Sequence, residues 1–386
     1  MENRGQNPSI MILAGEPSGD ARGAELAREL KKRLKGVRLW GFGGDLMSEE
    51  GVEIVRHIRD LSMVGAVEIL HKLPDIFRHY RQITRLVRER EPRLAVLIDY
   101  PGFNLRVARY LHSVSVPVVY YIIPQVWAWG KNRIKKLKKY VTKAIVLFPF
   151  EDKLLKDNGI DSFFAGHPLA DSFPEDPCEK PSGTVSSTVK VALLPGSRKH
   201  EINSMLPVML EAADRINGTL GKTVFTLAES PNIDRALYDN MLSSHPALET
   251  ERFRGDTRAA LKETDVAIIT SGTATLEGAM MVKPMVIVYK ASRLTYLLYL
   301  LLSRVPFLGL ANIIAGKKIV PELLQDALTP ENLSKEVIDI VKTPARALKM
   351  KEDLEKVRLS LGKKGAAERA AEEISGLYKN LYGHSD

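Results

Sequence analysis

Short apolar runs alternate with longer amphipathic stretches along most of the chain. Unbroken runs of Val, Ile and Leu are typical of parallel strands buried on both faces, and amphipathic helices usually connect such strands. The expected strands span 9–14, 37–42, 94–98, 116–123, 143–147 and 162–165 in the first half, and 189–194, 223–227, 266–269 and 285–289 in the second. Helices are expected between them, notably at 20–34 and 69–90. The pattern predicts an α/β fold with two doubly wound, Rossmann-like parallel sheets.

The two sets of strands are separated by a segment without periodicity. Residues 171–188 are rich in Pro, Ser, Asp and Glu, which is typical of a linker. The expected domains are therefore 1–170 and 189–343, followed by C-terminal helices at 344–386, and a length of 386 residues suits two domains. Because open parallel sheets bind ligands beyond the carboxyl ends of their strands, we expect the two domains to face each other across a ligand-binding cleft.

Composition narrows the class of protein. An apolar fraction of 45% and a charged fraction of 27% exclude a disordered chain. The apolar run at 294–302 is only about half the length that spans a bilayer, and the N-terminal apolar stretch is too short for a signal peptide. The single cysteine, Cys178, excludes an intramolecular disulfide. These features favour a cytoplasmic location.

A net charge of +9 allows nucleic acid, anionic lipid or phosphorylated small molecules as partners. The densest basic run, at 131–143, carries Ile134, Leu137 and Val141 at helical spacing, so one face of the expected helix is predicted to pack. A solvated helix face is the simplest explanation of the charges. An anionic membrane surface comes second and nucleic acid third, because no recognition motif accompanies the run.

The most informative stretch is VAIITSGTATLEGAMM at 266–281, where an apolar strand leads directly into a helix. Gly272 permits close approach of the backbone to an anion, and the unpaired N–H groups of a helix start favour one. Glu277 stands one turn after Thr273, where a carboxylate can accept hydrogen bonds from vicinal hydroxyls. A phosphate contact and a sugar contact one turn apart indicate a nucleotide diphosphate. An ordinary helix start with a solvated Glu277 explains the same residues equally well.

A second glycine turn, PGSRKHE at 195–201, follows the expected strand at 189–194. Its Arg198 suits a pyrophosphate, because a guanidinium donates two parallel hydrogen bonds and keeps its charge. No Asp-x-Asp and no His-Glu-x-x-His occurs, and His167 in its GHP turn is better explained as a hydrogen-bonded structural residue. We therefore expect no metal, and Arg198 and the 272–274 helix start would stabilise a departing diphosphate without a cation.

Strand ends in the first half carry further polar residues. In GEPSGD, at 15–20, Ser18 is expected to cap the next helix, and Glu16 is left as an unpaired carboxylate at the loop tip. In DYPGFN, at 99–104, Asp99 either caps the helix before Pro101 or acts as a general base whose pKa is raised by partial burial. The residues alone favour the cap.

Two of the three tryptophans lie in the turn PQVWAWG at 124–130. Trp127 and Trp129 occupy alternate positions and need not share a face. One could close the core while the other covers apolar ligand surface, and core packing is the better explanation for at least one of them.

Together the turns GEPSGD, IDYPGFN, PQVWAW, GHPLAD, LLPGSR, TSGTATLE and ANIIAG resemble lipid A disaccharide synthase, a glycosyltransferase family with the two-domain GT-B architecture. The resemblance runs from about Ile10 to beyond Leu324. The chain departs from the family at three places. Gln125 stands where the family usually has Ser, Ala311 where Pro is common, and the GGD at 43–45 where the motif often ends in Gly-Pro.

The resemblance implies an inverting transfer of 2,3-diacylglucosamine from its UDP donor to the 6-hydroxyl of 2,3-diacylglucosamine 1-phosphate. The products would be a beta-1,6-linked lipid A disaccharide and UDP. It makes the first domain the acceptor domain and the second the UDP-sugar donor domain. It assigns Asp99 as the catalytic base, reversing the preference for a cap. It implies that Arg198, Glu277 and Asn312 hold UDP, with Glu277 on the ribose, and that Glu16 and Ser18 lie on the acceptor side. The implied substrate-binding residues are Gly15, Glu16, Ser18, Gln125, Gly196, Ser197, Arg198, Gly272, Thr273, Ala274, Glu277 and Asn312.

Residues 61–77 and 294–310 carry more apolar side chains than one helix face needs. Both segments fit a buried core, and both fit a partly exposed patch that meets acyl chains or the bilayer interface. The expected partners are the UDP-diacylglucosamine donor, the diacylglucosamine 1-phosphate acceptor, the cytoplasmic face of the inner membrane by peripheral association, and a second copy of the chain in a homodimer. Neither a cofactor nor nucleic acid is expected.

Two rival functions remain open at this point. A UDP-sugar epimerase on the same fold would need the nucleotide-binding turns without the apolar patches. A peripheral membrane protein could hold a nucleotide without turning it over.

Overall fold

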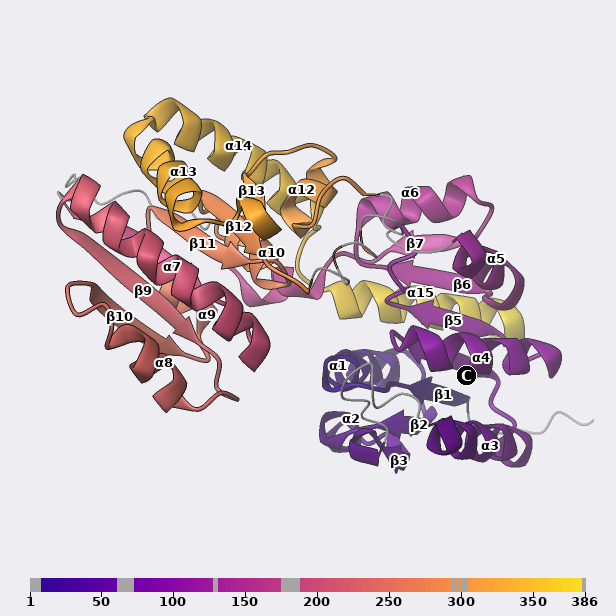
Figure 1. Ribbon diagram of the computed structural model, residues 1–386. Coiled ribbons are helices and arrows are strands. Elements are labelled where there is room, and N and C mark those ends of the chain that lie inside the picture. Colours follow the sequence, from indigo (N-terminus) through magenta and orange to yellow (C-terminus); the bar gives the residue numbers. More distant parts are fainter. Residues whose placement is uncertain are drawn as a thin grey trace, which may run out of the picture. The chain divides into compact units, whose positions relative to one another are not determined.

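The computed structural model describes residues 8–60, 73–127, 131–174, 188–292, 296, 299 and 305–383. The chain folds into two compact units, one formed by the residues up to Asp171 together with those from Gly362 onward, the other by Ser172–Leu361. Each unit contains one parallel sheet with helices on both faces (Figure 1). The predicted α/β class with two Rossmann-like sheets is confirmed.

The sheet of the first unit has seven parallel strands in the order β3-β2-β1-β4-β5-β6-β7. Its strands are β1 (Ser9–Leu13), β2 (Arg38–Gly43), β3 (Glu53–His57), β4 (Leu94–Ile98), β5 (Val118–Tyr121), β6 (Lys143–Val146) and β7 (Ser162–Phe164). The side chains of β4 are all buried, as expected for a central strand with helices on both faces. The helices are α1 (Pro17–Arg33), α2 (Asp45–Glu49), α3 (Leu73–Arg90), α4 (Pro101–Ser113), α5 (Lys131–Tyr140), α6 (Pro149–Asp157) and α15 (Ala366–Tyr382), with short 3₁₀ turns η1 (Ile58–Asp60) and η2 (Pro168–Ser172).

The sheet of the second unit has six parallel strands in the order β10-β9-β8-β11-β12-β13. They are β8 (Val189–Leu194), β9 (Thr223–Glu229), β10 (Glu249–Arg254), β11 (Val266–Thr270), β12 (Met285–Tyr289) and β13 (Glu322–Leu324). The helices are α7 (Lys199–Leu220), α8 (Arg235–Leu242), α9 (Thr257–Lys262), α10 (Ala274–Met280), α12 (Leu310–Ala315), α13 (Pro330–Lys342) and α14 (Pro344–Ser360), with η3 (Gln325–Ala327). Buried Val, Ile, Leu and Met side chains from β8, β11 and β12 pack against α7, α13 and α14 to form its core.

Each sheet has one point at which the strand order reverses. In the first unit it lies between β1 and β4, where Leu13 pairs with Leu97. In the second it lies between β8 and β11, where Leu194 pairs with Ile269. Connections leave in opposite directions at such a switch point and open a crevice at the carboxyl ends of the two strands. The candidate site residues should therefore be sought in the turns after these four strands.

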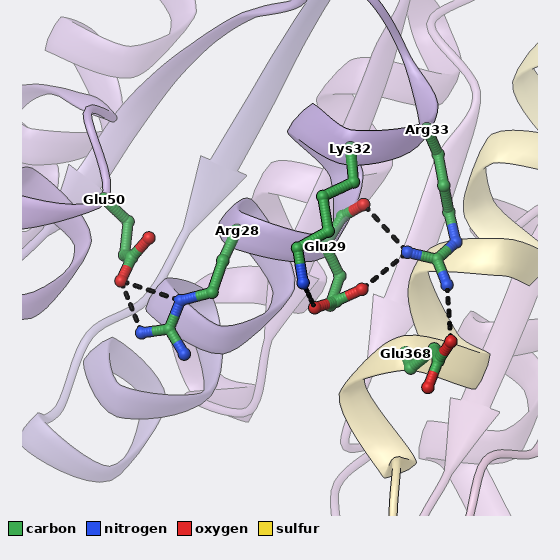
Figure 2. A network of polar contacts seen from close by, with 6 residues as sticks. All are labelled: Arg28, Glu29, Lys32, Arg33, Glu50 and Glu368. Atoms are coloured by element: carbon green, nitrogen blue, oxygen red, sulfur yellow. Dashed lines mark hydrogen bonds and ion pairs between the residues drawn. The ribbon is translucent and has the colours of Figure 1, made fainter.

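The last helix belongs to the first unit. Arg33 on α1 donates to Glu368 on α15 at 3.2 Å, and Glu29 accepts from both Lys32 and Arg33 (Figure 2). Arg369 donates to the carbonyl of Ala165 at 2.8 Å. The helical segment 344–386 is thus divided, because α14 lies in the second unit and α15 in the first.

Several predictions of local structure need correction. The strands β3, β10 and β13 were not expected, because they lie at sheet edges and carry partly exposed, charged residues in place of apolar runs. The helix expected from position 20 begins at Pro17, and its N-cap is Glu16 with no side-chain hydrogen bond. Ser18 is an exposed residue of the first turn, so the prediction that it caps the helix is wrong.

The basic run behaves as the spacing predicted. Leu137 and Val141 are buried and Ile134 packs against the same core, while Lys135, Lys136 and Lys139 are exposed to solvent. Residues 61–72, most of 293–304, the linker at 175–187 and Trp129 lie outside the described residues, and so does most of each predicted apolar patch. None of the described helices is both long enough and apolar enough to cross a membrane.

Candidate active site

Asp99 occupies an unusual turn at the end of β4. Asp99 and Tyr100 have φ angles of 45° and 46°, in the left-handed region that residues other than glycine seldom adopt. The Asn104 side-chain amide donates to the carbonyls of Ile98 (3.0 Å) and Asp99 (2.7 Å), and the Tyr120 hydroxyl donates to the latter at 2.8 Å. Such strain persists where surrounding contacts hold the backbone, and it is concentrated at functional sites.

The carboxyl group of Asp99 does not cap a helix. Helix α4 begins at Pro101, its N-cap is Tyr100, and no side chain makes a cap hydrogen bond. Burial, and to a lesser extent the negative charge of Glu16, raise the pKa of Asp99 to about 6, although the hydrogen bond from the backbone N–H of Tyr100 acts in the opposite direction. The structural alternative for Asp99 is therefore wrong, and its pKa lies close to the range in which a general base works.

The turn after β1 packs directly on the turn after β4. A Cβ atom added to Gly15 would lie 2.4 Å from Cγ of Tyr100, so only glycine permits this approach. Glu16 follows as an exposed carboxylate, close enough to influence the pKa of Asp99. The switch point of the first unit thus brings together Gly15, Glu16 and Asp99.

The turn after β5 contains three consecutive residues of alternating exposure. Gln125 is exposed, whereas Pro124 and Val126 on either side of it are buried. Trp127 is half-buried and donates through Nε1 to the carboxylate of Glu151 at 3.0 Å. Glu151 carried no signal in the sequence beyond its place in the first turn of a helix.

In the second unit, the turn between β11 and α10 offers unused backbone donors. The N–H groups of Gly272, Thr273 and Ala274 have no acceptor among the described residues, although the N–H groups of Thr275 and Glu277 are paired within the turn. The space beside Gly272 is open, with no atom within 4 Å of an added Cβ. A helix start with free donors and open space can hold an anion.

The neighbouring turn after β8 uses its donors differently. The backbone N–H groups of Ser197 and Arg198 both donate to the carboxylate of Glu201, at 3.0 and 3.1 Å. Gly196 has a φ of +108°, and an added Cβ would lie 2.6 Å from that carboxylate. The side chain of Arg198 remains 73% exposed, with one contact of 3.3 Å to Glu201. The guanidinium of Arg198 is therefore available to a ligand, whereas the backbone N–H groups of Ser197 and Arg198 are already used.

Glu201 was missed in the sequence, although its position three residues into the helix is that of a capping box. Replacing Glu201 with Ala should lower the free energy of unfolding by about 1–3 kcal/mol, because two backbone donors lose their acceptor. Urea denaturation measures the change. Glu211→Ala, at an exposed position on the same helix, should change it by less than about 0.5 kcal/mol. Equal stability of the two variants would mean that Glu201 does not hold the turn.

Glu277 is not a freely solvated residue. Burial raises its pKa, a hydrogen bond with Thr257 and the charge of Arg258 lower it, and Asp256 raises it. The side chain is half-buried and faces the first turn of α9. It therefore lies in a partly desolvated setting, in which hydrogen bonds to a carboxylate are stronger than in water.

Asn312 is completely buried, and its amide is fully used within the protein. Its Nδ2 donates to the carbonyl of Val320 (3.0 Å) and to Glu322 (2.7 Å), and its Oδ1 accepts from the backbone N–H groups of Ile319 and Val320. Glu322 also accepts from the N–H groups of Leu308 and Gly309 at 2.9 and 3.0 Å. The Asn312 side chain therefore has no hydrogen-bonding capacity left for a ligand, and it braces the segment around α12.

Over the parts of the chain that the structure describes, no group of three or more His, Cys, Asp or Glu is arranged to hold a metal ion.

Comparison with known proteins was made on sequence and on structure. A family model described as lipid-A-disaccharide synthetase matches residues 10–374. Lipid-A-disaccharide synthase of Anaeromyxobacter sp. (strain K) is 38% identical over 373 residues, covering 96% of this chain and 97% of that protein. The enzyme of the same name from Syntrophus aciditrophicus (strain SB) is 38% identical over 366 residues, with coverage of 94% and 96%.

Solved structures share the fold at low sequence identity. MurG of Acinetobacter baumannii superimposes with a TM-score of 0.60 at 14% identity, covering 97% of this chain and 100% of that one. The S. aureus MnaA–UDP co-structure gives a TM-score of 0.62 at 13% identity, covering 98% of both chains. UDP-GlcNAc 2-epimerase from Neisseria meningitidis, bound to UDP-GlcNAc, gives 0.62 at 10% identity, covering 96% of this chain and all of the other. At such identities the likeness shows the fold alone.

Proposed function

Because this chain belongs to the lipid-A-disaccharide synthetase family and is a glycosyltransferase of GT-B fold, we propose that it transfers 2,3-diacylglucosamine from UDP to the 6-hydroxyl of 2,3-diacylglucosamine 1-phosphate. The transfer inverts the anomeric centre and yields a beta-1,6-linked disaccharide and UDP. One observation carries the assignment of residues. The base candidate and the diphosphate-binding candidates each stand at the switch point of their own sheet.

In the first unit, Asp99 acts as the general base. Its carboxylate takes the proton of the acceptor 6-hydroxyl as that oxygen bonds to C1 of the donor sugar. The bond between C1 and the diphosphate oxygen breaks in the same displacement, and its electron pair leaves with UDP. With a pKa of about 6, the carboxylate is mostly ionised at neutral pH and is still a stronger base than an ordinary aspartate. Gly15, Glu16, Ser18 and Gln125 line the acceptor side.

In the second unit, the diphosphate is held without a metal ion. The free N–H groups of Gly272, Thr273 and Ala274 and the exposed guanidinium of Arg198 are the donors, and the charge that develops on the leaving diphosphate strengthens these contacts. Glu277 accepts from the ribose hydroxyls. Gly196 and Ser197 shape the turn that presents Arg198. Asn312 acts through the segment it braces and does not contact UDP with its side chain.

The epimerase alternative is not favoured. Solved structures named UDP-N-acetylglucosamine 2-epimerase resemble this chain in fold at 10–13% identity, whereas the proteins that match at 38% identity over nearly the full chain are named lipid-A-disaccharide synthase. Mass spectrometry of products from the diacylated donor and acceptor tests the proposal. We expect a disaccharide 1-phosphate and an equal amount of UDP, and no isomerised sugar from UDP-N-acetylglucosamine. Isomerisation without disaccharide would contradict the proposed reaction.

We infer that the enzyme works as a peripheral protein at the cytoplasmic face of the inner membrane, because the proposed donor and acceptor carry acyl chains that reside in bilayers. Sedimentation with vesicles that contain anionic lipid should recover the protein, and absence of binding at low salt would contradict this location. A homodimer stays a prediction that light scattering can test.

The rate of transfer should depend on the ionisation of Asp99. Because a base works in its ionised form, kcat/KM should fall as the pH drops through about 6, the pKa of the free enzyme, and not through about 4 as for an ordinary aspartate. Glu16→Gln removes the negative charge that helps to raise the pKa, so the acid limb should move to lower pH while burial keeps it above the ordinary value. Glu89→Gln, an exposed residue paired with Arg85, is the control and should leave the limb in place. An acid limb that stays in place in Glu16→Gln would mean that Asp99 is not the titrating base.

A further inference from the structure

A buried carboxyl group lies behind the turn that carries Gln125. Glu151, in the first turn of α6, is 4% exposed, and its Oε1 accepts from Nε1 of Trp127 at 3.0 Å. Trp127 belongs to the turn after β5, whereas Glu151 follows β6. The hydrogen bond therefore ties together the turns at the carboxyl ends of two adjacent strands.

Aromatic rings extend this connection across the carboxyl ends of neighbouring strands. Trp127 meets Phe150 edge-on, with ring centroids 5.6 Å apart, and Phe150 stacks on Phe148 at 5.5 Å. Phe148 in turn lies 5.2 Å from the ring of His167, which follows β7. The Trp127 indole is thus held on one side by packing and at its N–H by a hydrogen bond, so its position is well defined.

Burial of the Glu151 carboxyl group is unfavourable for the stability of the folded protein. Burial raises the pKa of Glu151 to about 7, and hydrogen bonds from Trp127 and from the backbone of Phe148 and Leu147 act in the opposite direction. Among the described residues, no charged side chain contributes to this shift. A folded protein is usually less stable with a buried carboxyl group that lacks a cationic partner than with an apolar side chain of similar size at the same position. The role of Glu151 is therefore better explained by its hydrogen bond to the indole than by a contribution to stability.

We propose that Glu151 is a positioning residue for the acceptor substrate, because it anchors Trp127 and thereby fixes the turn that presents Gln125. The proposal rests on the proposed function, in which this turn lines the acceptor side. Gln125 and Trp127 are separated by a single residue, the buried Val126. The backbone turns tightly there, because the N–H of Val126 donates to the carbonyl of Pro124 at 2.6 Å. A displacement of the indole is therefore passed to the backbone of Gln125.

A double-mutant cycle isolates this hydrogen bond. Trp127→Phe removes the N–H and keeps an aromatic ring, Glu151→Leu removes the acceptor, and the double variant removes both. Each single variant should raise the KM for the acceptor by about tenfold, since a small misplacement of a binding group weakens an oriented contact. The double variant should be no worse than the singles, because the two changes break the same interaction. The affinity for UDP, measured by calorimetry, should stay that of the unaltered enzyme.

Trp40→Phe is the matched control. The Trp40 indole in the same unit also donates through Nε1 to a side chain, Ser9 Oγ at 3.2 Å, but it lies on β2, away from the Gln125 turn. This variant should leave the acceptor KM unchanged. If loss of an indole N–H acted only through a general loss of structure, Trp40→Phe would raise the acceptor KM as much as Trp127→Phe does.

An unchanged acceptor KM in Trp127→Phe, fully additive effects in the double variant, or an equal loss of UDP affinity would each overturn the proposal. If Glu151→Leu does not fold, the comparison of Trp127→Phe with Trp40→Phe decides alone. Failure of the unaltered enzyme to form disaccharide would instead count against the proposed function, so the two failures can be told apart.

Discussion

Replacement of Asp99 by Asn is expected to lower kcat by about a hundredfold or more, which is the typical cost of losing a general base. The amide keeps the size of the carboxyl group but cannot accept the proton of the acceptor hydroxyl at neutral pH. The turn should survive, because Asn104 and Tyr120 donate to the backbone carbonyl of Asp99, and the amide oxygen of Asn can still accept from the backbone N–H of Tyr100. UDP affinity should stay near normal, since the proposed UDP contacts are all in the second unit. Steady-state kinetics and calorimetry measure the two quantities.

Asp157→Asn is the control for this variant. Asp157 is an exposed carboxylate of the same unit, paired with Lys153 at 3.2 Å, and its replacement should leave kcat unchanged. The residual activity of Asp99→Asn should also lose its acid limb, because the titrating group is gone. A turnover equal to that of the unaltered enzyme would remove Asp99 from the role of base.

Replacement of Arg198 by Ala is expected to weaken the binding of UDP by about 1.5–3 kcal/mol, the range for hydrogen bonds to a charged group. This corresponds to an increase in Kd of about 10- to 150-fold. The side chain is largely exposed, and its ion pair with Glu201, at 3.3 Å, is the one that the described residues provide, so most of its donors are available to a diphosphate. Calorimetry with UDP alone measures the effect without any acceptor.

Two further variants sharpen this test. Arg198→Lys keeps the charge but loses the planar pair of donors, so its affinity for UDP should lie between those of Ala and Arg. Arg215→Ala removes an exposed arginine from the same helix, where it pairs with Glu331, and should leave UDP affinity unchanged. Equal affinity of Arg198→Ala and the unaltered protein would refute the diphosphate role.

The central strands were predictable because their signal is local. A strand such as β4 or β11 is buried on both faces, so every position along it is apolar, and the run is visible without knowledge of its neighbours. The edge strands β3, β10 and β13 escaped prediction for the opposite reason. A strand at an edge has only one neighbour, so exposed residues such as Glu53 and Glu249 are tolerated there. Glu322 on β13 is tolerated for another reason, because it accepts hydrogen bonds from Asn312, Leu308 and Gly309.

The same contrast applies to the site. The glycine turns, Arg198, Glu277 and Asp99 could be selected from residue types at strand ends, because turn chemistry depends on a few neighbouring residues. The roles of Ser18 as a cap and of Asp99 as a cap were wrong, since both depended on where a helix actually begins. The pairing of Glu201 with its turn and the saturation of Asn312 were not visible, because each depends on which backbone groups already have a partner.

Local pattern thus specified the α/β class, the central strands and the turns that carry the chemistry, since these follow from the periodicity and chemistry of short segments. The order of the strands in each sheet, which only the tertiary structure shows, specified which of these turns lie side by side. It placed the turn after β1 beside that after β4, and the turn after β8 beside that after β11, and these neighbours are separated by about 70 or more residues of chain. Burial of Asp99 and the free or occupied state of each backbone donor follow from those long-range contacts, and no short segment encodes them.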